Sequence, residues 1–137
     1  MHSMRGMRNR FHLAILAGDL AETVPFYTEI LQCELGNDAE EGRYQDIEFW
    51  GHELTLHNST PRDNYDCEIH DVEMGKVLTP HMGIHLSEEE YHLVLQRVTP
   101  HIIEEPITRY EGRDTEQRTF FIRDPNYNVI EIKYLRG

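Results

Sequence analysis

Two stretches of the chain, residues 11–19 and 80–88, share one order of apolar and polar positions. In each stretch a histidine, His12 or His81, opens a short apolar run that contains a small residue and an isoleucine. Seven positions after each histidine, an acidic residue begins a segment whose apolar positions recur at helical spacing. The repeat predicts two copies of one strand-then-helix unit in a pseudo-symmetric domain.

The first copy predicts a strand over residues 10–17 and then a helix that Asp19 caps. The apolar positions at helical spacing in this segment are Leu20, Val24, Tyr27 and Leu31. Pro25 lies among them, and because proline lacks a backbone N–H it predicts a kink or an end of the regular helix.

Two further strands, over residues 44–50 and 52–57, are predicted to form a hairpin with Gly51 at the turn. Side chains alternate between the two faces of a strand, so the polar residues of the second strand share one face and its leucines the other. These polar residues are Glu53, Thr55 and His57.

The second copy predicts the same order of elements. A strand over residues 79–86 leads into a helix that begins with the capping box of Ser87 and Glu90. The predicted buried stripe of this helix is Tyr91, Val94, Leu95 and Val98. Further strands are predicted over residues 102–105, 117–123 and 128–134, with a turn at 124–126. Each half therefore holds one strand, one helix and two or three further strands, an α+β organisation.

The length of 137 residues predicts a single domain over residues 1–137. Its first module covers about 8–58 and its second about 79–135. Residues 59–78 are polar, acidic and without periodicity, which is typical of a connector.

The formal net charge of −12 argues against a nucleic-acid partner and against an anionic membrane surface, since both need clustered lysine and arginine. The N-terminus lacks the apolar core of a signal peptide, and no apolar stretch approaches membrane length. The two cysteines, Cys33 and Cys67, have no metal-ligand spacing, and we interpret them as thiols in a reducing compartment. These features predict a cytoplasmic protein.

A carboxylate in the last predicted strand joins the two histidines as a candidate for metal binding. Glu131 alternates with apolar neighbours and therefore faces away from them. An ionised glutamate on an interior face needs a strong partner, which a divalent metal supplies. His12, His81 and Glu131 together make a 2-His-1-carboxylate set, which leaves coordination positions open for substrate or O2.

The chain as a whole resembles the vicinal oxygen chelate superfamily, the group of glyoxalases, extradiol dioxygenases, epimerases and fosfomycin-type resistance enzymes. It is most similar to the small extradiol-dioxygenase-like proteins, whose pattern includes the hairpin at 49–53 and the pair Glu116-Gln117. The other matching segments are His12, residues 26–27 and 30–31, residues 80–83, residues 124–126 and residues 128–131.

The resemblance implies two βαβββ modules that form an incomplete barrel around one metal, held by His12, His81 and Glu131. Such proteins often take a fourth ligand from the last strand of the first module. The matching position is Thr55, a poor ligand, and His57 on the same face is the candidate to replace it. The chain also departs from the family where glycine is usual, with Gln32 in one turn and Tyr127 in another.

Several further residues are candidates for acid-base catalysis or substrate binding near the metal. His85 shares a strand face with His81 by alternation and, with Tyr110 and Tyr127, is a candidate acid-base group. The mixed-charge loop at 112–118 either closes over substrate or is a surface turn, and the match of the Glu116-Gln117 pair favours closure. In that case Arg113 or Arg118 binds an anionic group.

The function expected from the resemblance is a metal-dependent, dioxygenase-like enzyme that acts on a small oxygenated substrate such as a catechol. Fe(II) is the preferred metal, with Zn, Mn or Ni as alternatives, because His and carboxylate suit several ions. A lyase or isomerase of the glyoxalase type, a drug-binding protein without catalysis and a structural pseudo-enzyme are the alternatives. We also expect a homodimer, and the sequence leaves open whether the modules close within one chain or across two.

Overall fold

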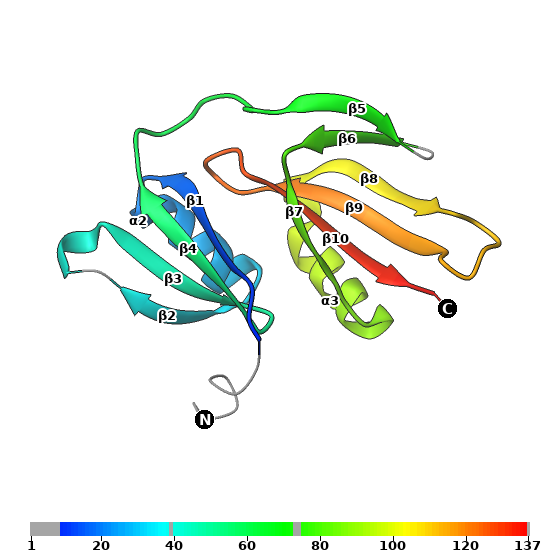
Figure 1. Ribbon diagram of the computed structural model, residues 1–137, viewed down its shortest axis with the longest axis horizontal. Helices are drawn as coiled ribbons and strands as arrows, with labels where there is room; N and C mark the ends of the chain where they lie inside the picture. The colour runs from blue at the N-terminus through cyan, green and yellow to red at the C-terminus, as the bar shows by residue number, and fades with distance from the viewer. Residues whose placement is uncertain (1–8, 39, 73–74, 137) are drawn as a thin grey trace. The chain divides into compact units, whose positions relative to one another are not determined.

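The computed structural model describes residues 9–38, 40–72 and 75–136 of the chain. The contacts divide the chain into two compact units, Met1–Arg62 and Asp63–Gly137 (Figure 1). Among the described residues, no helix has the length and apolar character needed to cross a membrane.

The first unit is a four-stranded sheet with one helical segment. The chain runs through strand β1 (His12–Gly18), helix α2 (Leu20–Pro25), the π-helical turn η1 (Phe26–Ile30), strand β2 (Glu34–Asp38), the short 3-10 helix η2 (Glu40–Gly42), strand β3 (Tyr44–Phe49) and strand β4 (His52–Asn58). The strand order is β1-β4-β3-β2, with β1 parallel to β4 and the other pairs antiparallel.

Local sequence explains both ends of the helical segment. The Asp19 side chain accepts a hydrogen bond from the Ala21 N–H and so caps α2, as predicted. Pro25 is the last residue of α2, and the chain continues as a π-helical turn because the proline offers no N–H to the regular helix. Strand β2, which follows, was not predicted.

The hairpin of β3 and β4 was predicted correctly, and its turn has two residues, Trp50 and Gly51. Phe49 pairs with His52 across the turn, and both turn residues have positive φ, 47° and 89°. Two-residue hairpin loops favour this left-handed conformation because it matches the twist of the strands.

The second unit repeats the first and adds a hairpin. Its elements are β5 (Glu68–Val72), β6 (Gly75–Thr79), β7 (Met82–His85), α3 (Glu88–Val98), η3 (Thr99–His101), β8 (Ile102–Arg109), β9 (Gln117–Arg123) and β10 (Val129–Leu135). The four-stranded order β7-β10-β9-β8 reproduces that of the first unit, again with one parallel pair, β7 and β10. Each unit thus contains one βαβββ module, as the resemblance implies.

Two predictions about this half need correction. The predicted connector contains the two-stranded hairpin β5–β6, whose Val77 packs against Phe121 and Val129 of the second sheet. The strand predicted to end at Glu105 continues to Arg109, although Pro106 lies within it. Register shifts in β8 before and after Glu104 accommodate this irregularity.

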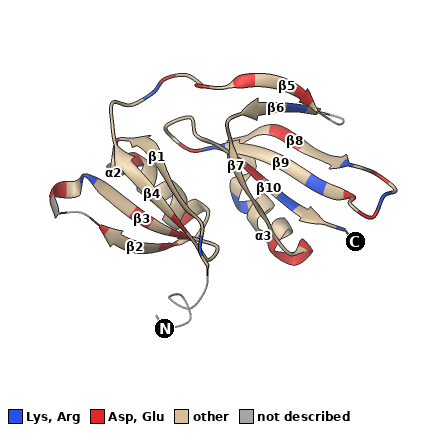
Figure 2. Cartoon of the chain, viewed as in Figure 1, with Lys and Arg blue, Asp and Glu red and all other residues tan. Residues whose placement is uncertain are grey.

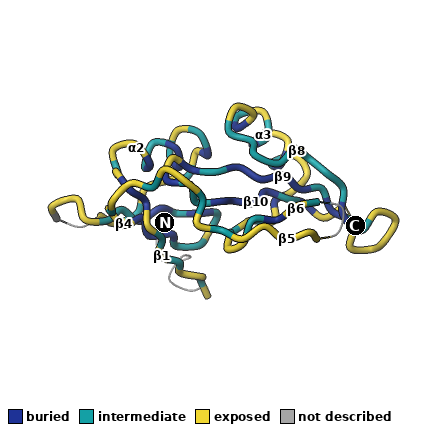
Figure 3. The backbone as a smooth tube through the Cα atoms, turned by 90° about the horizontal axis from the view of Figure 1, so that it is seen from above, coloured by how far each residue is buried: buried dark blue, intermediate teal, exposed yellow. Residues whose placement is uncertain are grey.

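The second sheet has an apolar face covered by α3 and a polar face on the opposite side. Ser87 caps α3 by accepting a hydrogen bond from the Glu90 N–H, and acidic residues gather at this end of the helix (Figure 2). The Tyr91 ring of α3 contacts Phe120 and Tyr134 at 5.2 and 4.7 Å between centroids. The tube in Figure 3 is largely buried along β9 and β10, whereas β5 is exposed.

Gln32 and Tyr127, which stand where the similar family has glycine, both adopt positive φ, 61° and 66°. The left-handed region costs a side-chain-bearing residue about 1 kcal/mol or more. The turns therefore keep the conformation that suits glycine although the residues have changed.

Candidate functional site

His81 and Glu131 lie together on the polar face of the second sheet, which we define by Thr119, Glu131 and Lys133. His81 lies just before β7, and Gly83 of β7 pairs with Glu131 of β10. The His81 Nε2 is 3.3 Å from the Glu131 Oε1. The two predicted ligands of the second module are therefore neighbours.

The other ring nitrogen of His81 fixes the orientation of the imidazole. Its Nδ1 lies 2.8 Å from the Leu78 carbonyl oxygen. A carbonyl only accepts, so Nδ1 carries the hydrogen and Nε2 is directed at the carboxylate. An Nδ1–H bonded to a backbone carbonyl is the arrangement that orients a histidine ligand of a metal.

Glu131 is ionised and held on several sides, although it is only 7% exposed. Burial raises the carboxyl pKa, but the hydrogen bonds with His81 and Thr119 and the positive charge of Lys133 outweigh burial and bring the pKa of Glu131 from 4.5 to about 2. Thr119 Oγ1 donates to Oε2 at 2.6 Å, and Lys133 Nζ is 3.7 Å from Oε1. The hydrogen bond with Glu131 raises the pKa of His81 against the opposing effect of burial.

A glycine makes the close approach of β7 and β10 possible at this point. A Cβ placed on Gly83 would lie 2.7 Å from the backbone oxygen of Glu131 and 3.1 Å from its Cβ. Any side chain there would push the two strands apart where His81 and Glu131 meet.

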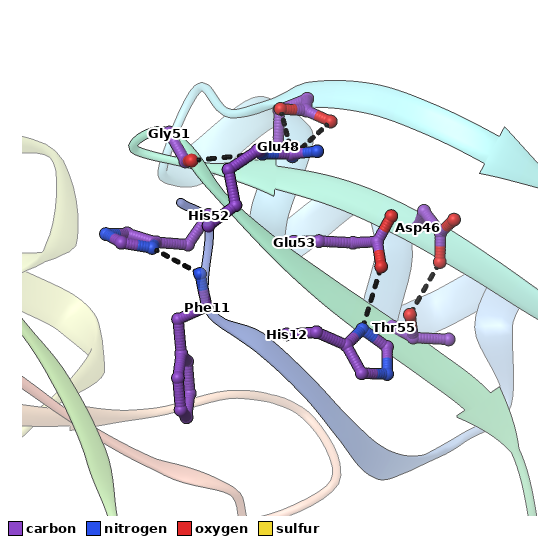
Figure 4. Close-up of polar contacts among 9 residues, drawn as sticks. Phe11, His12, Asp46, Glu48, Gly51, His52, Glu53 and Thr55 are labelled. Carbon is purple, nitrogen blue, oxygen red and sulfur yellow. Dashed lines mark hydrogen bonds and ion pairs between the residues drawn. The ribbon is translucent and has the colours of Figure 1, made fainter. Parts of the chain in front are cut away.

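His12 of the first unit has a comparable arrangement, drawn in Figure 4. It pairs with Glu53 between the parallel strands β1 and β4, and its Nδ1 is 2.8 Å from the Glu53 Oε1 (Figure 4). The carboxylate accepts the Nδ1–H, which leaves Nε2 as the ring atom with a lone pair. The side chain is 55% exposed, so Nε2 is accessible.

The strand register supports the predicted equivalence of Thr55 and Glu131. Ala14, two residues after His12, pairs with Thr55, just as Gly83, two residues after His81, pairs with Glu131. The Thr55 hydroxyl donates to the buried Asp46 carboxylate of β3 at 2.6 Å (Figure 4). The first sheet thus keeps a carboxylate beside this position, but on the neighbouring strand.

The candidate fourth ligand, His57, lies farther along β4, beyond Thr55. It pairs with Leu16 of β1 and Tyr44 of β3, and its exposed ring is 5.7 Å from the Tyr44 ring between centroids.

The candidate acid-base residues lie in three different surroundings within the second unit. His85 is exposed and pairs with Lys133, which places it on the polar face near Glu131. Tyr110 follows β8 with a φ of 55°. The Tyr127 ring packs edge-on against the Tyr65 ring, with 5.1 Å between the ring centroids. The guanidinium carbon of Arg123 lies 4.0 Å from the centroid of the Tyr127 ring.

The loop at 112–118 is held by its own contacts. Glu116 accepts hydrogen bonds from the Gly112 N–H and from Arg136, at 2.9 and 3.0 Å. Arg118 Nη1 donates to the Thr108 hydroxyl at 3.0 Å, and the Arg113 guanidinium carbon is 5.6 Å from the Tyr110 ring centroid. These contacts give Glu116 and both arginines local structural partners.

Sequence reasoning assigned no role at the site to four residues that hold or neighbour the predicted ligands. They are Asp46, Glu53, Thr119 and Lys133. Lys133 lies two residues after Glu131, and Glu53 lies two residues before Thr55. The alternation of side chains along a strand therefore places each pair on one face and could have identified both residues. Asp46 and Thr119 come from neighbouring strands, and only the register identifies them.

Neither unit alone brings together three His, Cys, Asp or Glu side chains suited to a metal within the described ranges 9–38, 40–72 and 75–136. The second unit offers two donors, His81 Nε2 and the Glu131 carboxylate, and the first offers His12 Nε2. Imidazole nitrogen and carboxylate oxygen are donors that Fe, Zn, Mn and Ni all accept, so the donor chemistry fits a divalent transition metal.

Solved structures similar to this chain include proteins named as a glyoxalase/bleomycin resistance protein/dioxygenase and as a fosfomycin resistance protein. The chain is similar to a glyoxalase/bleomycin resistance protein/dioxygenase from Alicyclobacillus acidocaldarius, with 29% identity, a TM-score of 0.74 and coverage of 95% of this chain and 93% of that one. A fosfomycin resistance protein from Listeria monocytogenes shares the fold at 13% identity and a TM-score of 0.65, with 93% of each chain covered. A virulence protein from Salmonella typhimurium does so at 20% identity and a TM-score of 0.62, with 94% of this chain and 98% of that one covered.

No protein-family model and no curated protein matches the sequence. The structural likenesses nevertheless confirm the predicted resemblance, and the chain has the fold of the vicinal oxygen chelate superfamily. The fold is compatible with glyoxalases, resistance proteins and dioxygenases alike and does not select one activity among them.

Proposed function

We propose that the chain is a metal-dependent enzyme of the vicinal oxygen chelate type, with His12, His81 and Glu131 as protein ligands. The observation that carries the proposal is the state of the two imidazoles. In both, Nδ1–H is engaged by an acceptor, Glu53 or the Leu78 carbonyl, so that Nε2 is the donor atom available to a cation.

The state of Glu131 supports the same assignment. Its carboxylate is already ionised at neutral pH, and Thr119 holds one of its oxygens. A proton on His81 Nε2 compensates the buried charge of Glu131, and the hydrogen bond between the two groups favours that proton by raising the pKa of His81. A divalent metal would take the place of that proton, and both ligands would keep their outer partners, the Leu78 carbonyl for His81 and Thr119 for Glu131.

The metal we favour is Fe(II), with Zn, Mn or Ni as alternatives, and the reaction we favour is dioxygenase-like chemistry on a catechol-like substrate. Such a metal supplies Lewis acidity that lowers the pKa of an adjacent substrate hydroxyl. In this reading His85 moves a proton from the polar face beside Lys133, and Tyr110 and Tyr127 are the other acid-base candidates. Thr119 and Glu53 position ligands and take no part in proton transfer.

Activity measured with separately loaded metals tests this proposal. The purified protein is stripped with a chelator, reconstituted without oxygen with Fe(II), Mn(II), Zn(II) or Ni(II), and assayed for O2 uptake with catechols. Uptake with the Fe(II) form that is lost in Glu131→Ala supports the dioxygenase. Metal binding without O2 uptake, combined with turnover of a glyoxalase-type substrate, favours the lyase or isomerase. Binding of a small molecule by protein that takes up no metal favours the drug-binding alternative.

The expected homodimer and the cytoplasmic location remain predictions. Light scattering on the purified protein gives the mass in solution and decides the first, and fractionation of cells that express the full chain decides the second.

A further inference from the structure

The second unit contains a cavity of about 440 Å³ between the β5–β6 hairpin and the polar side of β8 and β9. Its walls come from Gly75 and Lys76 of β6, from β8, and from Thr119 and Phe121 of β9. Its volume lies in the range of small-molecule sites. No part of it depends on the first unit.

Two wall residues connect the cavity to the proposed metal ligands. Thr119 lines the cavity and donates its hydroxyl hydrogen to Glu131 at 2.6 Å. Phe121 also lines it, and the Phe121 ring lies 5.1 Å from the His81 ring, edge to face. A molecule in the cavity therefore lies next to side chains that contact Glu131 and His81.

The rest of the wall combines an apolar surface with one buried cation. Ile103, Ile107 and Phe121 supply the apolar part. Arg109 lines the cavity while only 4% exposed, and its Nη1 donates to the Val72 carbonyl at 2.8 Å. That bond joins the end of β8 to the β5–β6 hairpin and holds the guanidinium in place.

The hairpin is fitted closely against this arginine. A Cβ on Gly75 would lie 2.7 Å from Ile107 Cδ1 and 3.4 Å from Arg109 Nη2. The absence of a side chain at Gly75 lets β6 approach β8 at the cavity wall, where Lys76 adds a second positive charge. Glu104 and Glu105 also line the cavity, so the charge of the wall is mixed.

We propose that this cavity binds the body of the substrate and that Arg109 recognises an anionic group on it, such as a carboxylate. The inference deepens the proposed function and rests on it, because it assigns a substrate class to the same site. The apolar walls select a compact ring or hydrocarbon body, and the buried guanidinium selects the anion, since Arg binds planar carboxylates through paired hydrogen bonds. The Glu104 carboxylate, which also lines the cavity, repels an anion and so lowers the affinity for it.

The test compares two probes that differ in charge and hardly in shape, 3,4-dihydroxybenzoate and 3,4-dihydroxybenzamide. Calorimetry without oxygen on the Zn(II)-loaded protein gives the Kd of each. We expect the benzoate to bind about tenfold or more tightly than the amide, as a charge-assisted pair predicts. Arg109→Gln should abolish this preference, Arg109→Lys should restore part of it, and Glu104→Gln should increase it.

Lys76→Gln and Glu104→Gln keep the inference testable if the Arg109 variants do not fold, because these two side chains are less buried. Equal binding of the two probes, weaker benzoate binding in Glu104→Gln, or failure of both probes to bind would overturn the inference. Measuring the affinities for benzoate and benzamide on protein stripped of metal distinguishes failure of this inference from failure of the proposed function. A charge preference without any metal uptake refutes the enzyme proposal alone, whereas metal uptake without a charge preference refutes the cavity assignment alone.

Discussion

The substitution Glu131→Gln tests the most specific electrostatic feature of the second unit, the ionised carboxylate that contacts His81 and Thr119. Glutamine has nearly the shape of protonated glutamate, so it removes the charge with little change in packing. The measurement uses protein freed of metal by a chelator, so that the contacts of Glu131 with His81, Thr119 and Lys133 alone determine its contribution to stability. The expected effect is a loss of stability that depends on pH.

The size of the effect follows from the pKa of Glu131, which is lowered from 4.5 to about 2. At 1.36 kcal/mol per unit, this difference corresponds to about 3 kcal/mol of stability at neutral pH. Because the folded-state pKa lies below the unfolded value, the contribution is present above about pH 4.5 and is lost as the pH falls toward 2. More than half of it should be gone at about pH 3.

Urea denaturation of the wild type and Glu131→Gln between about pH 6 and pH 3 measures this difference directly. The two free energies of unfolding should differ most at the upper end and converge at the lower end. Glu89→Gln, a change at the exposed start of α3, is the surface control. A difference that stays constant with pH would show that Glu131 is not an ionised, paired carboxylate and would refute the reasoning.

Three further changes test neighbouring parts of the account. Thr119→Val removes the hydroxyl that holds Glu131 and should weaken metal binding about 10- to 100-fold in competition with a chelator; unchanged affinity would assign Thr119 to packing alone. Gly83→Ala should cost about 1–3 kcal/mol in urea denaturation, because its Cβ meets the Glu131 backbone, and a neutral result would contradict the close strand contact. Asp124→Ala removes a buried acceptor of three hydrogen bonds from Asn126 and Asn128 and should cost about 2–3 kcal/mol, measured as a lower Tm; an unchanged Tm would mean that the turn holds without it.

Most of the fold follows from local patterns in the sequence. The repeat of His12 and His81, the caps at Asp19 and Ser87, and the alternation around Glu131 place the βαβββ modules along the chain. The hairpin β5–β6 was not predicted because its apolar residues do not alternate with polar ones and most of its residues are exposed, and because its pairing depends on contact of Val77 with the second sheet. Strand β8 was cut short at Glu105 because Pro106 removes a donor, which the irregular register tolerates.

Part of the candidate site could likewise be predicted from local patterns, and the rest could not. Alternation within one strand identifies Glu131 and the polar face, and the repeat identifies both histidines. The partners that set the state of these groups, Thr119 and Glu53, come from pairing between strands, which no local pattern gives. Arg109, rather than Arg113 or Arg118, lines the cavity, because the course of β8 beyond Pro106 decides which arginine faces inward.

Metal content is the measurement that tests the central claim most directly. Elemental analysis of protein purified without chelator, beside His12→Ala, His81→Ala and Glu131→Ala, should show about one equivalent of a divalent metal in the wild type and its loss in all three variants. His85→Ala, an exposed change on the same polar face, should retain the metal. A wild type that holds no metal after reconstitution without oxygen with Fe(II), Mn(II), Zn(II) or Ni(II), or variants that keep it in full, would contradict the assignment of these three residues as ligands.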